Sequence, residues 1–389
     1  MIKIMFVAHS GKISGGANRS LLDIVEELRK RGNYAPLVLV PEENSELQQR
    51  CNSLGIPVFV GRYHSCCTQY QHTLKDVLRF GKIYTAPFLD LWEGKRLASS
   101  FPQDIDLVYT NDRMTVIGAF LAKQRNIPHI WHVRSFAAEN ATAYAGYYRR
   151  IMDRYSDRIV LISRALYEEF ARHFSVEKLR LIHNGIHFDR YEIQPVPHEG
   201  YNLLLSGRIV PAKGQHVAVE AMVLLARKYH RENVNLLLAG QVPQYDDGGY
   251  YLQLQRAIQD GGVRDRVFFL GEQQDMNSVR AQVDLEMMCS RKEAFGRVTI
   301  EAMSCGIPVI GTESGGTKDI IQNGKTGFLF PPEDAEKLAE TINWCMDNRE
   351  ETACIADRGR RYVRTHFSLT QTVDRIEELI REVLREERN

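Results

Sequence analysis

Short apolar runs alternate with helical patterns along the chain. Residues 2–8 form an almost continuous apolar run, and the segment that follows has Leu21, Leu22, Val25 and Leu28 at the spacing of one helix face. A strand that is apolar on both faces is typical of a parallel sheet covered by helices on both sides. The pattern therefore predicts an α/β fold that opens with a strand, a loop and a helix.

The same alternation continues in two blocks. Residues 191–200, rich in Pro, charge and turn formers, separate the blocks and are typical of an interdomain linker. The apolar runs predict strands at 36–40, 105–109, 127–133 and 158–162 in the first block, and at 202–206, 234–239, 267–270, 285–288, 308–311 and 327–330 in the second.

The chain length agrees with two domains, because 389 residues exceed what one hydrophobic core usually supports. We expect an N-terminal domain over residues 1–190, a linker over 191–200 and a C-terminal domain over 201–368. A final amphipathic helix over 369–389 completes the second domain or packs on the first.

Composition and charge narrow the class of protein. The sequence is 44% hydrophobic and 25% charged with a formal net charge of +1, which gives no overall attraction to nucleic acid. Its seven cysteines are odd in number and lack paired spacing, so we expect reduced thiols in the cytoplasm. The first apolar run is too short for a signal peptide and no 18-residue apolar stretch occurs, so we expect a soluble or peripheral protein.

Two glutamates frame the most informative segment. Glu293 and Glu301 have seven residues between them, and the second lies on a predicted helix that ends at Gly306 before a strand. A carboxylate accepts two hydrogen bonds at once, which suits the vicinal diol of a ribose or a hexose. Taken alone, such a pair is more often solvated or caps a helix.

This segment resembles the signature of the retaining glycosyltransferases, particularly glycosyltransferase family 4. The resemblance implies the GT-B architecture, in which two Rossmann-like domains face each other across a cleft, and a final helix that crosses back to the first domain. It also implies that Glu301 holds the donor's ribose and Glu293 the transferring sugar. The residues between them implied in donor binding are Ala294, Phe295, Gly296 and Arg297.

Arg297 departs from the family, which commonly has Leu at this position. The substitution adds a cation that can contact phosphate or acceptor.

A basic turn stands after the predicted strand at 202–206. Arg208 and Lys213 precede Gly214 and a helix, where cations can neutralise a nucleotide diphosphate as the sugar bond breaks. In the family the matching Arg and Lys contact the diphosphate. A solvated basic loop is the plainer alternative.

Three glycines complete the donor site that the resemblance implies. Gly15 and Gly16 stand where the family has a glycine pair facing the donor phosphates, and their spacing is not that of a dinucleotide-binding loop. Gly271 lies in the turn that the family uses near the base. A further pair, Gly315 and Gly316, precedes a helix and is typical of a backbone that approaches phosphate.

His132 lies near the carboxyl end of the strand predicted over 127–133, and open α/β sheets bind ligands at strand carboxyl ends. It matches the family's histidine beside the anomeric carbon, although a lone histidine is often structural.

Tyr and Arg residues interleave between 144 and 158 on a predicted helix. This face can touch anionic lipid and a lipid-linked acceptor, or it can pack its tyrosines inward. The residues are Tyr144, Tyr147, Tyr148, Arg149, Arg150, Arg154 and Arg158.

The sequence thus predicts a retaining glycosyltransferase with a nucleotide-sugar donor and a glycan or lipid-linked glycan as acceptor. We expect no cofactor and no metal, because no aspartate pair stands in a convincing loop context; Arg208 and Lys213 would meet the phosphate charge. A sugar-nucleotide 2-epimerase of the same architecture and a noncatalytic nucleotide-sugar-binding subunit remain alternatives.

Overall fold

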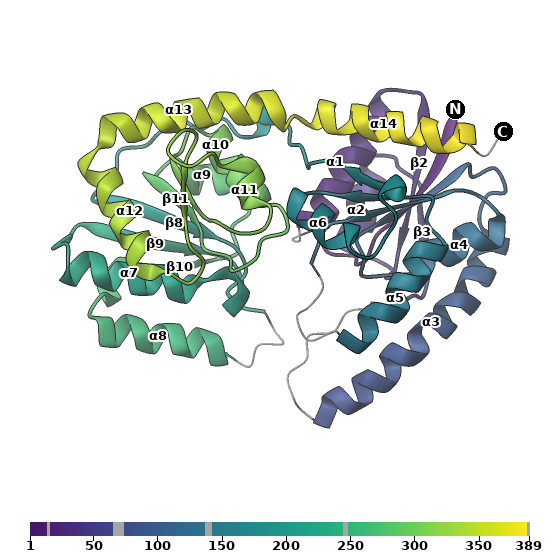
Figure 1. The fold of residues 1–389 in the computed structure, drawn as a ribbon, viewed down its shortest axis with the longest axis horizontal. Coiled ribbons are helices and arrows are strands. Elements are labelled where there is room, and N and C mark those ends of the chain that lie inside the picture. The colour runs from purple at the N-terminus through teal and green to yellow at the C-terminus, as the bar shows by residue number, and fades with distance from the viewer. Residues whose placement is uncertain (14–15, 65–73, 137–141, 244–247, 387–389) are drawn as a thin grey trace. The chain divides into compact units, whose positions relative to one another are not determined.

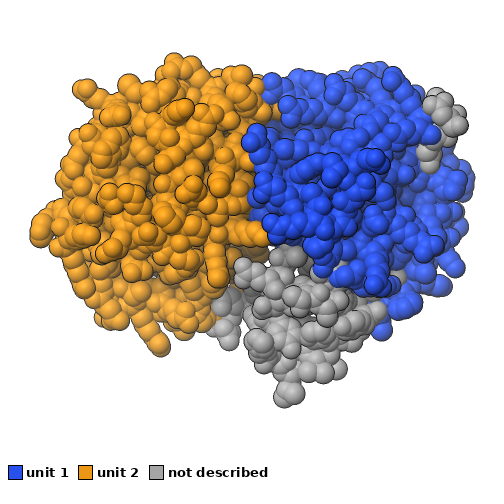
Figure 2. All heavy atoms as spheres, viewed as in Figure 1, with its two compact units in different colours: residues 1–185, 369–389 blue, residues 186–368 orange. Residues whose placement is uncertain are grey.

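The structure is a computed structural model that describes residues 1–13, 16–64, 74–136, 142–243 and 248–386. It divides into two compact units (Figures 1 and 2). Unit 1 comprises Met1–Gly185 and Leu369–Asn389, and unit 2 comprises Ile186–Ser368. Each unit is a parallel sheet with helices, so the predicted α/β class with two Rossmann-like domains is confirmed.

Unit 1 contains a seven-stranded sheet in the order β3-β2-β1-β4-β5-β6-β7. Every paired strand runs parallel to its neighbour. The strands are β1 (Ile2–Val7), β2 (Tyr34–Val40), β3 (Val58–Val60), β4 (Leu107–Asn111), β5 (His129–Val133), β6 (Arg158–Leu161) and β7 (Leu179–Leu181). The helices are α1 (Gly16–Lys30), α2 (Glu46–Ser53), α3 (Leu74–Ser100), α4 (Ile117–Arg125), α5 (Thr142–Arg154), α6 (Arg164–Ala171) and α14 (Leu369–Glu386).

The central strand β1 is buried on both faces because successive side chains point to opposite sides of a sheet. Ile4 and Phe6 belong to a core that includes residues of α1 and α14. Met5 and Val7 belong to a second core that includes residues of α3 and α4. Figure 1 shows α14, in yellow, beside α1, although it is the last helix of the chain.

Unit 2 repeats the plan with a six-stranded parallel sheet in the order β10-β9-β8-β11-β12-β13. The strands are β8 (Tyr201–Ser206), β9 (Val234–Ala239), β10 (Val267–Gly271), β11 (Leu285–Met288), β12 (Val309–Thr312) and β13 (Phe328–Phe330). The helices are α7 (Gln215–Arg227), α8 (Gly249–Gly261), α9 (Met276–Arg280), α10 (Arg297–Ser304), α11 (Thr317–Ile320), α12 (Ala335–Asp347) and α13 (Arg349–His366). One core joins apolar residues of β8, α7 and α12, among them Leu203, Met222 and Leu338.

Two strands were missed by the sequence pattern. Strands β3 and β7 have three residues each and lie at the two edges of the first sheet. Such a short edge strand has too few positions to show alternation. The residues expected as a linker, 191–200, lie within unit 2.

Candidate functional site

The candidate site in unit 2 lies at the carboxyl ends of its central strands. β8 pairs with β9 on one side and with β11 on the other, so the strand order changes direction between β8 and β11. Open α/β sheets bind ligands in the crevice at such a switch point. The loops after β8 and β11 carry half of the site residues predicted from sequence, namely Arg208, Lys213, Glu293, Ala294, Phe295 and Gly296.

Lys213 and Glu293 form an ion pair across these two loops. The Lys213 ammonium lies 2.6 Å from Glu293 Oε2, and the Ser290 hydroxyl donates to the same oxygen at 3.1 Å. Burial alone would raise the pKa of Glu293, but Lys213 and the hydrogen bond from Ser290 hold it below its usual value. Glu293 is therefore an anion at neutral pH and acts as a hydrogen-bond acceptor.

Arg208 and Lys213 both follow β8, and Lys213 ends a 3₁₀ turn over Pro211–Lys213. The Arg208 side chain is exposed, while its backbone carbonyl accepts a hydrogen bond of 2.9 Å from the Gln215 amide. This bond fixes the loop to the first residue of α7. The two cations therefore lie on one short turn that is anchored at both ends.

Gly315 and Gly316 bring two loops of unit 2 into backbone contact. A Cβ on Gly315 would lie 2.0 Å from the Glu293 carbonyl oxygen, and Gly315 has a φ of +54°. The Gly316 N–H donates to the same carbonyl at 2.8 Å. The close approach that these glycines permit is thus to the backbone of Glu293, and it fixes the loop that carries this side chain.

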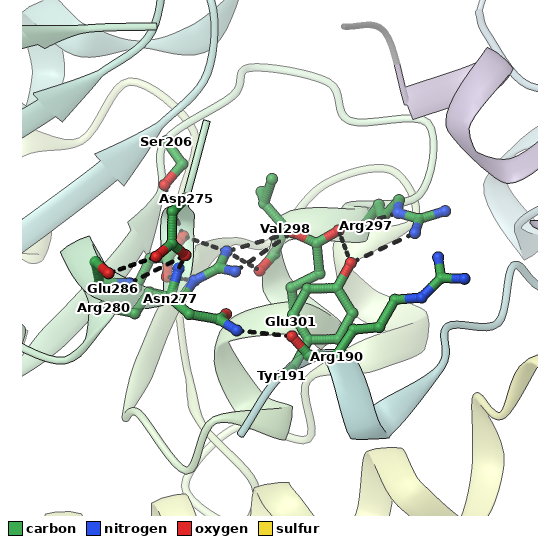
Figure 3. Close-up of polar contacts among 11 residues, drawn as sticks. Arg190, Tyr191, Ser206, Asp275, Asn277, Arg280, Glu286, Arg297, Val298 and Glu301 are labelled. Carbon is green, nitrogen blue, oxygen red and sulfur yellow. Dashed lines mark hydrogen bonds and ion pairs between the residues drawn. The ribbon is translucent and has the colours of Figure 1, made fainter. Parts of the chain in front are cut away.

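Glu301 lies on α10 and is 3% exposed. Figure 3 shows its polar contacts. Its Oε1 accepts hydrogen bonds from the Tyr191 hydroxyl and Arg297 Nε, both at 3.0 Å. Its Oε2 lies 3.4 Å from both terminal nitrogens of Arg280. The carboxylate therefore accepts hydrogen bonds from two guanidinium groups and a phenol.

Arg280 bridges Glu301 to a second buried carboxylate on β11. Its guanidinium donates to Glu286 at 2.8 and 3.2 Å, and Ser206 donates to Glu286 at 2.9 Å. Two anions and two cations make this network neutral when Arg297 is included. Sequence reasoning missed Arg280, Glu286 and Tyr191; the available signal was Glu286 within an otherwise apolar strand.

The remaining predicted residues of unit 2 lie around α10 and at the end of β10. Phe295 is buried, with its ring centroid 5.8 Å from that of Phe367. Gly296 caps α10 with a φ of +99°, and Ala294 is half-buried. Gly271 is exposed at the end of β10 and is not among the residues that the network joins.

Arg297 is bound within the network. Its Nε contacts Glu301 one helical turn away, so it compensates this carboxylate.

The predicted site residue of unit 1 with described side-chain contacts is His132. His132 is the penultimate residue of β5 and is fully buried; its Nδ1 lies 2.6 Å from the Tyr109 hydroxyl and 3.1 Å from an Arg134 terminal nitrogen. A guanidinium only donates, so Nδ1 accepts and the ring proton lies on Nε2. Burial and then Arg134 hold the pKa of His132 well below its usual value, so the ring is a neutral donor through Nε2.

Arg134 is itself buried and held in place. It donates to the side-chain oxygens of Asn111 and Asn184, each at 2.5 Å. Gly16 begins α1, whereas Gly15 lies outside the described residues.

The aromatic and basic residues expected on one helix lie on α5 with one exception. Arg158 was expected on the helix but lies in β6, where it donates to Glu382 at 2.9 Å and to Glu386 at 2.5 Å. Arg154 lies over the Tyr155 ring, and Tyr147 is 45% exposed. The side chain of Tyr144 lies outside the described residues. No helix in the described parts of the chain is long and apolar enough to span a bilayer.

Within residues 1–13, 16–64, 74–136, 142–243 and 248–386, no three His, Cys, Asp or Glu side chains lie close enough together to hold a metal ion. The expectation that none is required stays a prediction. Cys51, Cys289, Cys305 and Cys345 are buried free thiols and Cys354 is an exposed one, while Cys66 and Cys67 fall outside the described residues.

Two family models match consecutive parts of the chain. The model described as "Glycosyltransferase Family 4" matches residues 14–190, and the one described as "Glycosyl transferases group 1" matches residues 190–362.

Similar proteins come from several bacteria. The N-acetyl-alpha-D-glucosaminyl L-malate synthase of Bacillus anthracis is 33% identical over 157 residues, 40% of each chain. The capsular polysaccharide biosynthesis glycosyltransferase CapM of Staphylococcus aureus is 24% identical and the match covers 93% of each chain. A crystal structure of HepE from Anabaena with UDP and glucose has a TM-score of 0.82 at 24% identity, over 98% of this chain and 99% of that one.

Proposed function

The chain belongs to glycosyltransferase family 4 and has the GT-B architecture, and from this premise we propose that it moves a sugar from a nucleoside diphosphate to a hydroxyl acceptor with retention of anomeric configuration. The observation that carries the proposal is the Lys213–Glu293 ion pair at the carboxyl edge of the second sheet. It joins a cation suited to diphosphate with a carboxylate suited to sugar hydroxyls.

Each half of the donor has a proposed partner in unit 2. Glu301 accepts from the ribose hydroxyls, and Glu293 accepts from hydroxyls of the transferring sugar. Arg208 and Lys213 neutralise the diphosphate without a metal. Preorganised cations stabilise the transition state most where charge grows as the bond to the leaving group breaks.

The reaction needs no separate protein base. The bond from the anomeric carbon to the leaving phosphate oxygen breaks, and a bond to the acceptor oxygen forms on the same face. The acceptor proton passes to the departing phosphate. His132 suits a supporting role in unit 1, since a neutral ring that carries its proton on Nε2 donates a hydrogen bond and does not remove a proton there.

The acceptor is proposed to be a glycan or a lipid-linked glycan. CapM is named for capsular polysaccharide biosynthesis, and its match extends over almost the whole of both chains. The B. anthracis relative is named for an L-malate product, so a small hydroxy acid is the acceptor against which the glycan acceptors should be compared.

The test is a product analysis by NMR. The chain is incubated with UDP-glucose, UDP-N-acetylglucosamine or GDP-mannose and a panel of glycan acceptors, and the coupling constant of the new anomeric proton is measured. We expect an axial linkage from an α-configured gluco donor, which means retention. An equatorial linkage would reject the same-face mechanism.

A donor-only incubation separates the alternatives. Conversion of the sugar nucleotide without acceptor would identify an epimerase. Binding of the nucleotide sugar without turnover on any acceptor would identify a noncatalytic subunit.

A further inference from the structure

Both carboxylate oxygens of Glu301 already accept hydrogen bonds from protein side chains. A carboxylate offers about four lone-pair sites. Oε1 accepts from Tyr191 and from Arg297, and Oε2 accepts from two nitrogens of Arg280 (Figure 3). A ribose that is to donate to this carboxylate must therefore replace one of these partners.

Arg280 is the partner least able to leave. Its side chain is fully buried, and it donates to Glu286 at 2.8 Å and to the Val298 carbonyl at 3.4 Å. Moving it would leave Glu286 buried without its counter-charge, which is strongly unfavourable. Oε2 is therefore the anchored oxygen, and exchange takes place at Oε1.

At Oε1 the two partners differ in charge. Arg297 compensates the carboxylate from the same helix, so its departure would leave a buried anion partly uncompensated. Tyr191 supplies a neutral hydroxyl, as a ribose does, so that exchange changes no charge. Burial and then Glu301 raise the pKa of Tyr191, which keeps the phenol protonated as a donor at neutral pH.

The backbone holds Tyr191 in this position. It directly follows the 3₁₀ turn Phe188–Arg190, and the carbonyl of Arg190 accepts a hydrogen bond of 2.7 Å from the Asn277 amide (Figure 3). Asn277 lies in α9, whose N-terminus is capped by Asp275. The phenol is thus presented to Glu301 by a fixed turn.

We propose that the Tyr191 hydroxyl occupies the place of a ribose hydroxyl on Glu301 and that the donor nucleotide displaces it. Tyr191 then determines donor affinity, because only the fraction of molecules with Oε1 released can bind the ribose. The inference rests on the proposed function, in which Glu301 binds the ribose.

The test is calorimetric titration of the full chain with UDP, GDP and ADP. Tyr191→Phe keeps the ring and removes only the competing hydroxyl, so each diphosphate that the wild type binds should bind about tenfold more tightly, the factor expected if the hydroxyl is engaged about nine-tenths of the time. Donor KM should fall to a similar extent while kcat does not rise. Tyr191→Leu, which also lacks the hydroxyl, should tighten binding in the same direction.

Two controls make the result specific. Tyr229→Phe removes a phenol hydroxyl from the segment just after α7 in the same unit and should leave affinity unchanged. In a Glu301→Ala background, Tyr191→Phe should bring no gain. Thermal unfolding should show that each variant is folded.

The outcomes separate the two proposals. Unchanged or weaker binding by both Tyr191 variants overturns the displacement, while the glycosyltransferase assignment stands if the wild type binds a diphosphate. Failure of the wild type to bind any of the three overturns the proposed function and this inference with it.

Discussion

Lys213 has two partners in the proposed reaction, Glu293 and the leaving diphosphate. The ammonium lies 2.6 Å from Glu293 and holds the pKa of that carboxyl down against the effect of burial. Removing Lys213 would therefore change both the charge that meets the phosphate and the protonation of Glu293. Arg208 offers a comparison, since it is not among the groups that set the Glu293 pKa.

The residue-scale prediction compares Lys213→Ala with Arg208→Ala. Each should lower kcat by about 10²- to 10³-fold, as loss of a preorganised charge-stabilising donor does, with a smaller change in donor KM. Only Lys213→Ala should also raise the pKa of Glu293, so the acidic limb of its pH–kcat profile should move to higher pH. Lys213→Arg should keep the limb in place. A loss confined to donor KM in both variants would mean that the two cations anchor substrate only.

Spacing along the chain singled out candidate site residues but did not predict which residues surround them. Glu293, Glu301, Arg208 and Lys213 stand in local patterns, and the structure brings Lys213 and Glu293 into contact. Tyr191 is 110 residues from Glu301 in sequence, and no local sequence pattern distinguishes a tyrosine in a turn-rich stretch as a site residue. Their pairing depends on tertiary packing, which periodicity does not encode.

At the scale of elements, α14 is the clearest case of a pattern that leaves its partner open. Its periodicity predicts a buried stripe but not the sheet that the stripe covers. In the structure Val373, Ile376 and Ile380 are fully buried in the core of unit 1, and Arg31 on the first unit lies 2.6 Å from Asp374. Helix α14 therefore stabilises the first domain.

The corresponding prediction is that Ile376→Ala destabilises unit 1. Truncating a fully buried Ile costs about 2–5 kcal/mol, from lost burial and the cavity left behind. Denaturant unfolding followed by hydrogen exchange should show the loss in strands β1 and β4 while unit 2 keeps its stability. Glu378→Ala, at an exposed position of the same helix, should have little effect. A shift confined to unit 2 would contradict the assignment of this helix to the first core.

At the scale of the whole molecule, the two units differ in how their buried groups respond to acid. Burial lowers the pKa values of His9, His129 and His132, all in unit 1, and that of His129 falls to about 4. In unit 2, Lys213 and Ser290 keep the pKa of Glu293 below its ordinary value. Histidines that stay neutral in the folded state and a carboxylate that stays charged there lose their contributions to folding stability in different pH ranges.

The last prediction is therefore that acid unfolds unit 1 before unit 2. Below the unfolded histidine pKa of about 6.5, the unfolded state binds protons that these folded histidines do not, so their contribution to the stability of unit 1 falls as the pH decreases. Asp90 in the same unit, whose pKa burial raises to about 6, takes up a proton in the folded state and offsets part of this loss. For His129 alone the loss reaches about 3 kcal/mol by pH 4. The Glu293 contribution to stability is complete above its unfolded pKa and is lost only as the pH falls through the lower folded value, so unit 2 begins to weaken at a lower pH than unit 1.

Pulsed hydrogen exchange, corrected for the intrinsic pH dependence of exchange, should show loss of protection in β4 and β5 at a higher pH than in β8 and β11. His129→Asn retains a donor for the Tyr155 carbonyl that His129 Nδ1 contacts at 2.7 Å but cannot be protonated in this range, so it should move the unit 1 transition to lower pH. Equal midpoints for the two units, or a unit 1 midpoint unmoved by His129→Asn, would show that the buried histidines do not set the acid limit of the molecule.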